Sequence, residues 1–265
     1  MELKYLIILH SKRCLLRCPD QLITAQYNEL SEVTIMKQTT SAKSNLVVTT
    51  RFFLFLLFFI TSFYGYSQSP ISVVRIKYDG GGDWYGNRTT FVNLFSFMRQ
   101  NTKANTTERE VTLGILDQDF FKYPLAYIAG HGNIKFSDEE ASRLKEYLIK
   151  GGFLWADDDY GMDKHFRREM KKVFPDAEWV ELPFSHPIYH INDSFPNGLP
   201  KVHKHDGGAP KGLALFYEGR MVAFYSLNTD ISDGCEDAEV HNDPPEIRRA
   251  ALQMGTNILL WALLQ

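Results

Sequence analysis

Three adjacent aspartates follow an apolar stretch in the middle of the chain. The segment LWADDDYG, residues 154–161, passes from apolar residues to Asp157, Asp158 and Asp159. Adjacent carboxylates repel one another, and neither a strand nor a turn requires three of them. An aspartate after a strand often caps the next helix, and we expect Asp159 to have that role in part. Asp157 and Asp158 are therefore candidates for metal coordination or for acid–base catalysis.

Four histidines lie in residues 183–212, a proline-rich segment with little periodicity. His203 and His205 are two positions apart, so an extended chain presents both imidazoles on one side, as two metal ligands often are. His186 and His190 lie beside prolines that disfavour a helix, so their spacing is less informative. Imidazoles and carboxylates together suit a divalent ion such as zinc, manganese or iron, although histidines in a loop can also simply hydrogen-bond the backbone. The predicted metal ligands are Asp157, Asp158, His186, His190, His203 and His205.

A third polar group occupies residues 228–246, between the last predicted strand and the last predicted helix. Its acids and histidine are Asp230, Asp233, Glu236, Asp237, Glu239, His241 and Asp243. Carboxylate oxygens suit calcium, but the spacing does not match an EF-hand loop. We therefore favour the interpretation of residues 228–246 as a solvated acidic loop over a calcium site.

The apolar residues after Gln68 alternate between strand and helix patterns. Strands are predicted at residues 71–77, 111–116, 125–129, 153–156, 213–217 and 221–226, the last two joined as an antiparallel hairpin. Helices are predicted around residues 91–98, 137–150, 166–174 and 244–261. Ser137 with Glu140 forms a capping box for the second helix, and Asp243 is expected to cap the last one. This order predicts a three-layer, doubly wound α/β fold with a mostly parallel sheet, in a single domain spanning residues 68–265.

The ends of the predicted strands collect polar residues. Ligands of an open parallel sheet bind beyond the carboxyl ends of its strands, where this chain has Asp79, His131 and the three aspartates. His131 is the predicted acid or base acting on bound water or substrate. Aromatic residues in the neighbouring turns could stack on sugar rings. The catalytic candidates are His131, Asp157 and Asp158, and the ligand-binding candidates are Asp79, Trp84, Tyr160 and His241.

The part of the chain before Gln68 has the features of a secretory signal. Residues 52–66 form a nearly uncharged apolar block, which is shorter than the roughly 20 residues of a membrane-spanning helix. Basic but no acidic residues precede this block from position 36 onward. We expect a signal peptide at residues 36–67, an over-extended gene model at residues 1–35, and export to the periplasm or the exterior of a bacterium. The alternative is a cytoplasmic tail on an uncleaved anchor; with cleavage, no stable membrane insertion is expected.

Composition disfavours several classes of function. The chain has 265 residues and a formal net charge of −3, and because seven basic and four acidic residues precede Gln68, residues 68–265 carry about −6. This acidity disfavours nucleic acid as a partner. Cys235 is the single cysteine after Gln68, which excludes an internal disulfide there, and its acidic surroundings disfavour a nucleophilic thiolate. The chain has no GxSxG, GxGxxG or GxxxxGKS/T motif, so we predict no nucleotide cofactor.

Four long segments carry a family resemblance. They are GGGDWYGNRTTF at residues 80–91, GGFLWADDDYG at 151–161, LPFSHPIYHINDSFPNGLPKVHKHDG at 182–207 and EDAEVHNDPPEIRRAALQMGTNI at 236–258. With them, residues 71–265 resemble the bacterial family known as domain of unknown function 4159. That family resembles class I glutamine-amidotransferase-like and ThuA-like proteins, which implies a flavodoxin-like fold. At the position of the amidotransferase cysteine this chain has the Trp155–Asp158 stretch, so hydrolysis of glutamine is not expected.

These observations lead to one main hypothesis and two alternatives. The main hypothesis is an exported metal-dependent hydrolase whose site lies at the carboxyl edge of the sheet and acts on a small molecule or a glycan. The first alternative is a non-catalytic module that binds carbohydrate or an envelope protein. The second is an amidotransferase-like scaffold used for protein assembly.

Overall fold

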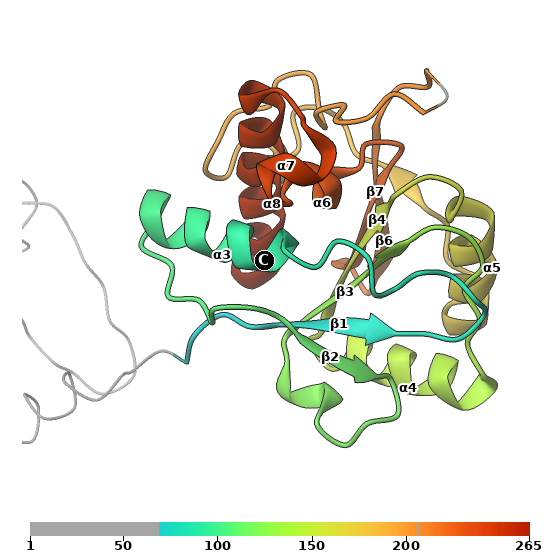
Figure 1. Cartoon of the computed structure of the whole chain (residues 1–265). Helices are drawn as coiled ribbons and strands as arrows, with labels where there is room; N and C mark the ends of the chain where they lie inside the picture. Colours follow the sequence, from blue (N-terminus) through green and yellow to red (C-terminus); the bar gives the residue numbers. More distant parts are fainter. Residues whose placement is uncertain (1–68, 206) are drawn as a thin grey trace, which may run out of the picture. The chain divides into compact units, whose positions relative to one another are not determined.

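A seven-stranded mixed sheet runs through the protein (Figure 1). This computed structural model describes residues 69–205 and 207–265, so the predicted signal peptide and the residues before it lie outside the described residues. The strands are β1 (Val73–Lys77), β2 (Val111–Gly114), β3 (Leu125–Gly130), β4 (Phe153–Asp158), β5 (Val180–Glu181), β6 (Lys211–Tyr217) and β7 (Arg220–Leu227). Their order across the sheet is β2-β1-β3-β4-β7-β6-β5. The five strands β2, β1, β3, β4 and β7 run parallel. β6 is antiparallel to β7, and β5 is antiparallel to β6.

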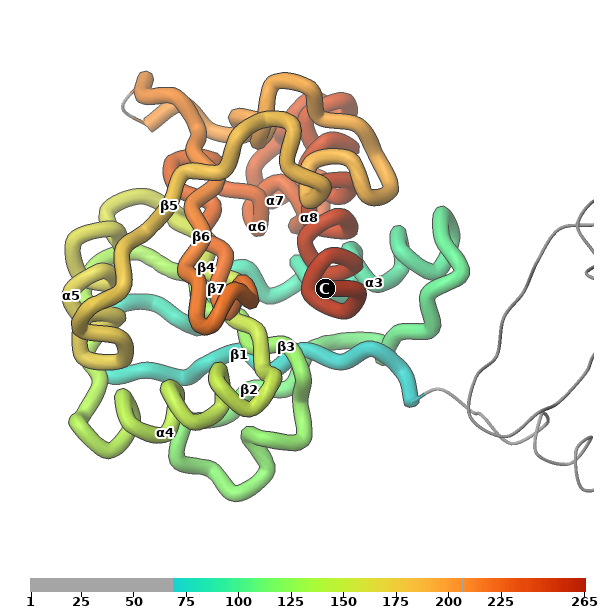
Figure 2. Tube along the Cα trace, turned by 180° about the vertical axis from the view of Figure 1, so that it is seen from behind, coloured from blue at the N-terminus to red at the C-terminus, as the bar shows by residue number. Residues whose placement is uncertain are grey.

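Helices cover both faces of the sheet, as Figures 1 and 2 show. Helices α3 (Thr90–Asn101) and α8 (Pro245–Leu264) pack on one face. Helices α4 (Asp138–Ile149) and α5 (Asp163–Val173) pack on the other face. Alternate residues of a strand point to opposite faces. In β4, Phe153 and Trp155 therefore belong to the core beneath α3 and α8. Leu154 and Ala156 belong to the core beneath α4 and α5.

Local sequence patterns explain the main elements. The predicted capping box of α4 is present, because Ser137 Oγ accepts a hydrogen bond from Glu140 N and the Glu140 carboxylate accepts one from Ser137 N. Every residue of β4 is buried, as expected for a strand that is covered on both faces. The predicted α/β class, the mostly parallel sheet and the antiparallel hairpin of β6 and β7 are confirmed.

Two predicted boundaries are wrong. β4 extends to Asp158, so the first two aspartates of the acidic run lie within the strand rather than after it. α8 has Pro244 at its N-cap, and Asp243 does not cap it. The Asp243 carboxylate contacts His203 instead, which makes it part of the site described below.

Several short elements cannot be recognised from periodicity. They are β5, the 3-10 turns η1 (Phe120–Lys122) and η2 (Pro187–Tyr189), and the helices α6 (Ile231–Gly234) and α7 (Ala238–His241). Each helical piece contains about one turn, which is too short to show an amphipathic pattern. Within residues 69–205 and 207–265, no helix has both the length and the apolar content that crossing a membrane requires.

Residues 183–205 form an ordered loop on the α8 side of the sheet (Figure 2). Ile188 is buried in the core beside α8, and the side-chain oxygen of Asn257 in α8 accepts two backbone hydrogen bonds from the loop. Further along, the Val202 N–H donates to the Thr229 carbonyl at 2.9 Å. The loop therefore returns to the carboxyl end of β7.

Candidate metal centre

Three neighbouring strands end at the same edge of the sheet. Gly130 of β3 pairs with Asp158 of β4, and Asp157 of β4 pairs with β7. Because these strands are parallel, the residues that follow them meet at their carboxyl ends. The chain after β7 turns through Asp230, whose φ of 61° lies in the left-handed region, and enters α6. The Ser232 N–H then donates to the Asp157 carboxylate at 2.6 Å, which holds α6 at this edge.

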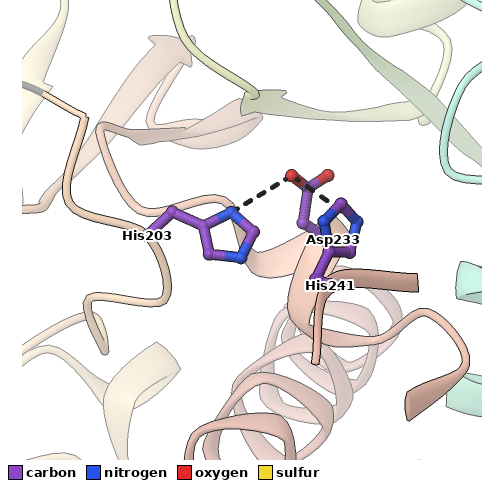
Figure 3. A group of neighbouring side chains, drawn as sticks. All are labelled: His203, Asp233 and His241. Atoms are coloured by element: carbon purple, nitrogen blue, oxygen red, sulfur yellow. Dashed lines mark ion pairs between the residues drawn. The ribbon is translucent and has the colours of Figure 1, made fainter. Parts of the chain in front are cut away.

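His203 lies among three carboxylates. Its Nδ1 atom is 3.2 Å from Asp230 Oδ2 and 3.3 Å from Asp233 Oδ2. Its Nε2 atom is 3.2 Å from both carboxylate oxygens of Asp243. Figure 3 shows His203 directed from the loop at Asp233 of α6, with His241 of α7 beside them. The cluster thus joins three segments that are separate in the sequence.

Two further histidines complete the cluster. His205 Nε2 contacts Asp230 Oδ2. His241 Nε2 lies 3.0 Å from Glu236 Oε2 and 3.9 Å from Asp233 Oδ2. Two groups of three residues have ligand atoms that all lie within 4.8 Å of one another. They share one histidine and consist of His203, Asp233 and His241, and of His203, His205 and Asp230.

Two carboxylates of the cluster, those of Asp230 and Asp233, have oxygen atoms that are available to coordinate an ion. The side chains of Asp230 and Asp233 are 1% and 7% exposed. Among the described residues, the Oδ1 atoms of both have no hydrogen-bond partner. A buried carboxylate oxygen is unfavourable unless a donor or a cation meets it. Since imidazole nitrogens and carboxylate oxygens are ligands of divalent transition ions, the residues present fit such an ion.

One side of the cluster faces solvent. The side chains of His205 and His241 are 30% and 28% exposed, whereas Asp230 and Asp233 are buried. An ion held between these residues would remain accessible to water and substrate, as a catalytic metal must. A hollow of about 290 Å³ lies elsewhere and is lined by residues of α5, β6 and the segment between them.

The carboxylates also determine the protonation of His203. Hydrogen bonds to Asp230 and then to Asp233 raise the pKa of His203 to about 10, although burial acts in the opposite direction. Coordination through Nδ1 requires loss of the proton on that atom. A metal ion and a proton therefore compete for His203.

Beneath the cluster, Ser232 joins two buried aspartates. Ser232 Oγ lies 2.7 Å from Asp157 Oδ2 and 2.9 Å from Asp159 Oδ1. Asn87 Nδ2 donates to Asp159 Oδ2 at 3.0 Å, and the Ser226 hydroxyl donates to Asp157 Oδ1. A hydroxyl has one hydrogen and cannot donate to both carboxyl groups, so the geometry favours one proton held by the pair.

The shifts in pKa agree with a shared proton. Burial raises the pKa of Asp157 to about 7, although hydrogen bonds from Ser226 and Ser232 oppose the shift. Burial, followed by the charges of Asp233 and Asp157, raises the pKa of Asp159 well above its usual range. Because Asp157 accepts more hydrogen bonds than Asp159, we assign the proton to Asp159.

Asp157 and Asp158, which were predicted as metal ligands, belong to neither group of convergent ligand atoms. Asp157 is fully buried in the Ser232 network. Asp158 Oδ1 accepts a hydrogen bond from Met162 N at 3.2 Å, which stabilises the turn before α5. The expectation that Asp159 helps to cap α5 is wrong, because its carboxyl group faces Ser232 and the loop before α3.

His186 and His190 make contacts within and beside their own loop. His186 Nδ1 accepts a hydrogen bond from Ile188 N at 3.2 Å, and its ring packs edge-on against Trp261. His190 Nε2 lies 2.8 Å from the Phe184 carbonyl oxygen. The other two histidines of the loop are the ones that join the metal groups.

The remaining strand-end candidates lie in three different environments. Asp79 accepts a backbone hydrogen bond from Lys135 N at 2.7 Å. Trp84 is partly buried against the core beneath α4 and α5. His131 Nδ1 lies 3.1 Å from Asp83 Oδ2. The structure therefore gives His131 a carboxylate partner that the sequence did not indicate.

Two ligand-binding candidates lie at the metal groups. The Tyr160 ring stacks on His205, with 4.7 Å between ring centroids and 24° between planes. His241 is itself a member of one group. The acidic residues beside it were missed as ligands, because a solvated loop was an adequate explanation for them. The burial of Asp230 and Asp233 shows that this explanation is wrong for those two. The position of Asp230 just after β7 was the available signal.

Comparison with known proteins identifies the family. The family model described as domain of unknown function (DUF4159) matches residues 72–263. Comparison with curated proteins finds no match. The match covers most of the chain, including every residue of the proposed cluster. The chain therefore belongs to the DUF4159 family.

Proposed function

We propose that this protein is an exported metal-dependent hydrolase that acts on a small molecule or a glycan. The observation that carries the proposal is the convergence of imidazole nitrogens and buried carboxylates at the carboxyl edge of the sheet. Three imidazoles favour a transition ion such as zinc, manganese or iron over calcium or magnesium. The basic flank and apolar block of residues 36–66 support export. The proposed ligands are His203, His205, Asp230, Asp233 and His241.

Residues around the ligands would prepare them for this role. An ion bound here would lower the pKa of a bound water and polarise the bond that is hydrolysed. Asp243 accepts a hydrogen bond from His203 Nε2 and so presents Nδ1 to the centre. The stacked Tyr160 ring restricts the orientation of His205. Both contacts reduce the reorganisation that metal binding would require.

The fold supports a site at this edge. The parallel strands follow the order β2-β1-β3-β4-β7, which corresponds to the flavodoxin-like order 2-1-3-4-5. We therefore assign the domain to the flavodoxin-like folds, the class to which the amidotransferase-like proteins belong. A thiol mechanism has less support, because Cys235 is fully buried and burial raises the pKa of its thiol.

A second candidate function is a non-catalytic glycan-binding module. Tyr160 favours it, because this aromatic residue is 49% exposed and its ring stacks on His205. The φ of Tyr160 is 84°, which is uncommon for a residue with a side chain and is often found at functional positions. Glycan binding by the metal-free protein that is lost in Tyr160→Ala would favour this function over hydrolysis.

Metal analysis of protein purified without chelators tests the main proposal. We expect about one divalent ion per chain and a higher melting temperature when zinc, manganese or iron(II) is added to metal-free protein. Asp233→Asn should lose both properties. Glu239→Gln is the matched control, because Glu239 is an exposed acid of α7. No bound metal together with an unchanged melting temperature would overturn the proposal.

A further inference from the structure

Asp83 and His131 form a bidentate contact apart from the proposed metal ligands. The two oxygens of Asp83 contact the backbone N–H and Nδ1 of His131, and the Nδ1–Oδ2 distance is 3.1 Å. The contact fixes the plane of the imidazole. With a proton on Nδ1 facing the carboxylate, Nε2 is the basic nitrogen. The His131 side chain is 51% exposed, so this nitrogen is available to a bound molecule.

Two glycines make the contact sterically feasible. A Cβ atom on Gly82 would lie 2.7 Å from the His131 carbonyl oxygen. A Cβ atom on Gly130, whose φ is 130°, would lie 2.9 Å from Asp83 Oδ1. Glycine at both positions lets the turn before Asp83 approach the end of β3. Larger residues at these positions would push the carboxylate away from the imidazole.

The pair lies at the same edge as the proposed metal centre. His131 directly follows β3, whose last residue pairs with the last residue of β4. The loop that begins at Asp83 reaches Asn87, whose amide donates to Ser232 Oγ in α6 at 2.9 Å. Ser232 is adjacent in sequence to the proposed ligand Asp233. One hydrogen bond, with a short stretch of chain on either side of it, therefore connects the pair with the metal centre.

Tyr78 packs against the two glycines beside the pair, because a Cβ atom on Gly82 or Gly130 would lie 2.9 Å or 2.6 Å from its hydroxyl oxygen. Its hydroxyl donates to the Ala129 carbonyl at 3.1 Å, at the end of β3. Burial, and after it the charges of Asp83 and Asp159, raise the pKa of Tyr78 above its usual range. The Tyr78 hydroxyl therefore belongs to the same turn of the structure as the pair.

We propose that His131 is the proton-transfer residue of the hydrolytic site and that Asp83 is its positioning residue. This inference rests on the proposed metal-dependent hydrolysis. With an ester substrate, a proton of water passes to His131 Nε2 while the water oxygen forms a bond to the carbonyl carbon. The proton then passes from Nε2 to the leaving alkoxide as the carbon–oxygen bond breaks. The products are a carboxylic acid and an alcohol, and His131 returns to its starting state.

Hydrolysis of p-nitrophenyl acetate by the zinc-loaded protein tests the inference. We expect His131→Gln to lower kcat by about 10²-fold. Asp83→Asn should lower kcat by about 10-fold. Both variants should keep the KM and the zinc content of the wild type. The controls are His165→Gln and Asp119→Asn, which change residues of the same types outside the site and should leave kcat unchanged.

The rate of chemical modification of His131 tests whether Asp83 positions the imidazole, and this measurement does not depend on catalytic turnover. Diethyl pyrocarbonate modifies the basic nitrogen of neutral imidazoles, and mass spectrometry follows the rate at each histidine. Because Asp83 orients the imidazole, Asp83→Asn should lower the rate at His131 several-fold. The rate at His165 in the same molecule should stay unchanged.

The outcomes distinguish this inference from the proposal on which it rests. Wild-type kcat in His131→Gln, or an unchanged modification rate in Asp83→Asn, overturns the inference and leaves the metal proposal standing. A zinc-loaded wild type that does not hydrolyse the ester also overturns the inference and leaves the metal proposal standing. A wild type that binds none of zinc, manganese and iron(II) overturns the proposed function and this inference with it.

Discussion

Nε2 of His203 lies 3.2 Å from both carboxylate oxygens of Asp243. The contact joins a loop residue to the segment before α8, 40 positions later in the sequence. It leaves Nδ1 directed at Asp230 and Asp233. Metal-binding histidines commonly have a carboxylate on the nitrogen that does not coordinate. Asp243 therefore determines which nitrogen of His203 faces the proposed ion.

We expect Asp243→Asn to lower the affinity for zinc by about 10–100-fold. An amide orients the imidazole less strongly than a carboxylate does. Competition with a chromophoric chelator measures the affinity. Glu239→Gln removes a nearby exposed acid and should leave the affinity close to that of the wild type. Equal losses in both variants would point to net charge rather than orientation as the cause.

Asp159→Asn should leave stability nearly unchanged, whereas Asp157→Asn should lower the free energy of unfolding by about 1–3 kcal/mol. A protonated Asp159 donates to Ser232 Oγ and accepts from Asn87, and an asparagine amide can make the same two hydrogen bonds. Asp157 accepts hydrogen bonds on both oxygens, so an amide nitrogen there would face a donor. Urea unfolding near pH 7 compares the variants. A larger loss for Asp159→Asn would assign the proton to Asp157 instead.

The metal-free protein should lose stability as the pH rises. Burial raises the pKa of Asp157 from its ordinary 3.8 to about 7 in the folded state, so its ionisation disfavours folding progressively between these values. The pKa of His203 is raised from 6.5 to about 10, so its stabilising charge is complete below about pH 6.5 and is lost toward about pH 10. Thermal unfolding of chelator-treated protein from about pH 5 to about pH 9 measures this effect.

Variants assign the two parts of this pH dependence. His203→Gln should flatten the curve above about pH 7, and Asp157→Asn should flatten it below about pH 7. Zinc should stabilise the protein more at high pH, because coordination requires neutral His203. A metal-free protein that becomes more stable between about pH 5 and about pH 9 would contradict the assignment.

Arg75→Met should lower the free energy of unfolding by about 3 kcal/mol or more. The buried guanidinium lies 2.9 Å from Glu110 and donates to three carbonyls within residues 84–87. Its loss leaves a largely buried carboxylate unpaired and releases the loop that reaches the site. Chemical unfolding measures the change. Arg88→Met, which alters an arginine of the same loop, should cost much less.

The main elements could be predicted because their causes are local. The capping box of Ser137 and Glu140 depends on residues three positions apart, and the buried strand β4 follows from an unbroken apolar run. The polar edge could also be predicted, since parallel strands align their carboxyl ends. The exact ends of β4 and α8 could not, because hydrogen bonds from other segments decide them.

The candidate site could be predicted in part. His203 and His205 were recognisable from residue type and spacing, and the structure places both in the cluster. Asp230 and Asp233 have the same local appearance as solvated acids. Whether a carboxylate is buried depends on the segments that pack over it, and these come from elsewhere in the chain.

By itself, the sequence determined the alternation of strands and helices, the edge where their ends meet and the residue types available there. Only the tertiary structure decided that His203 meets Asp230 and Asp233 instead of Asp157. The physical reason is packing: the loop is anchored on α8, and the left-handed turn at Asp230 directs α6 toward it. The contact of His203 with Asp230 and Asp233 therefore cannot be predicted from a pattern of neighbouring residues.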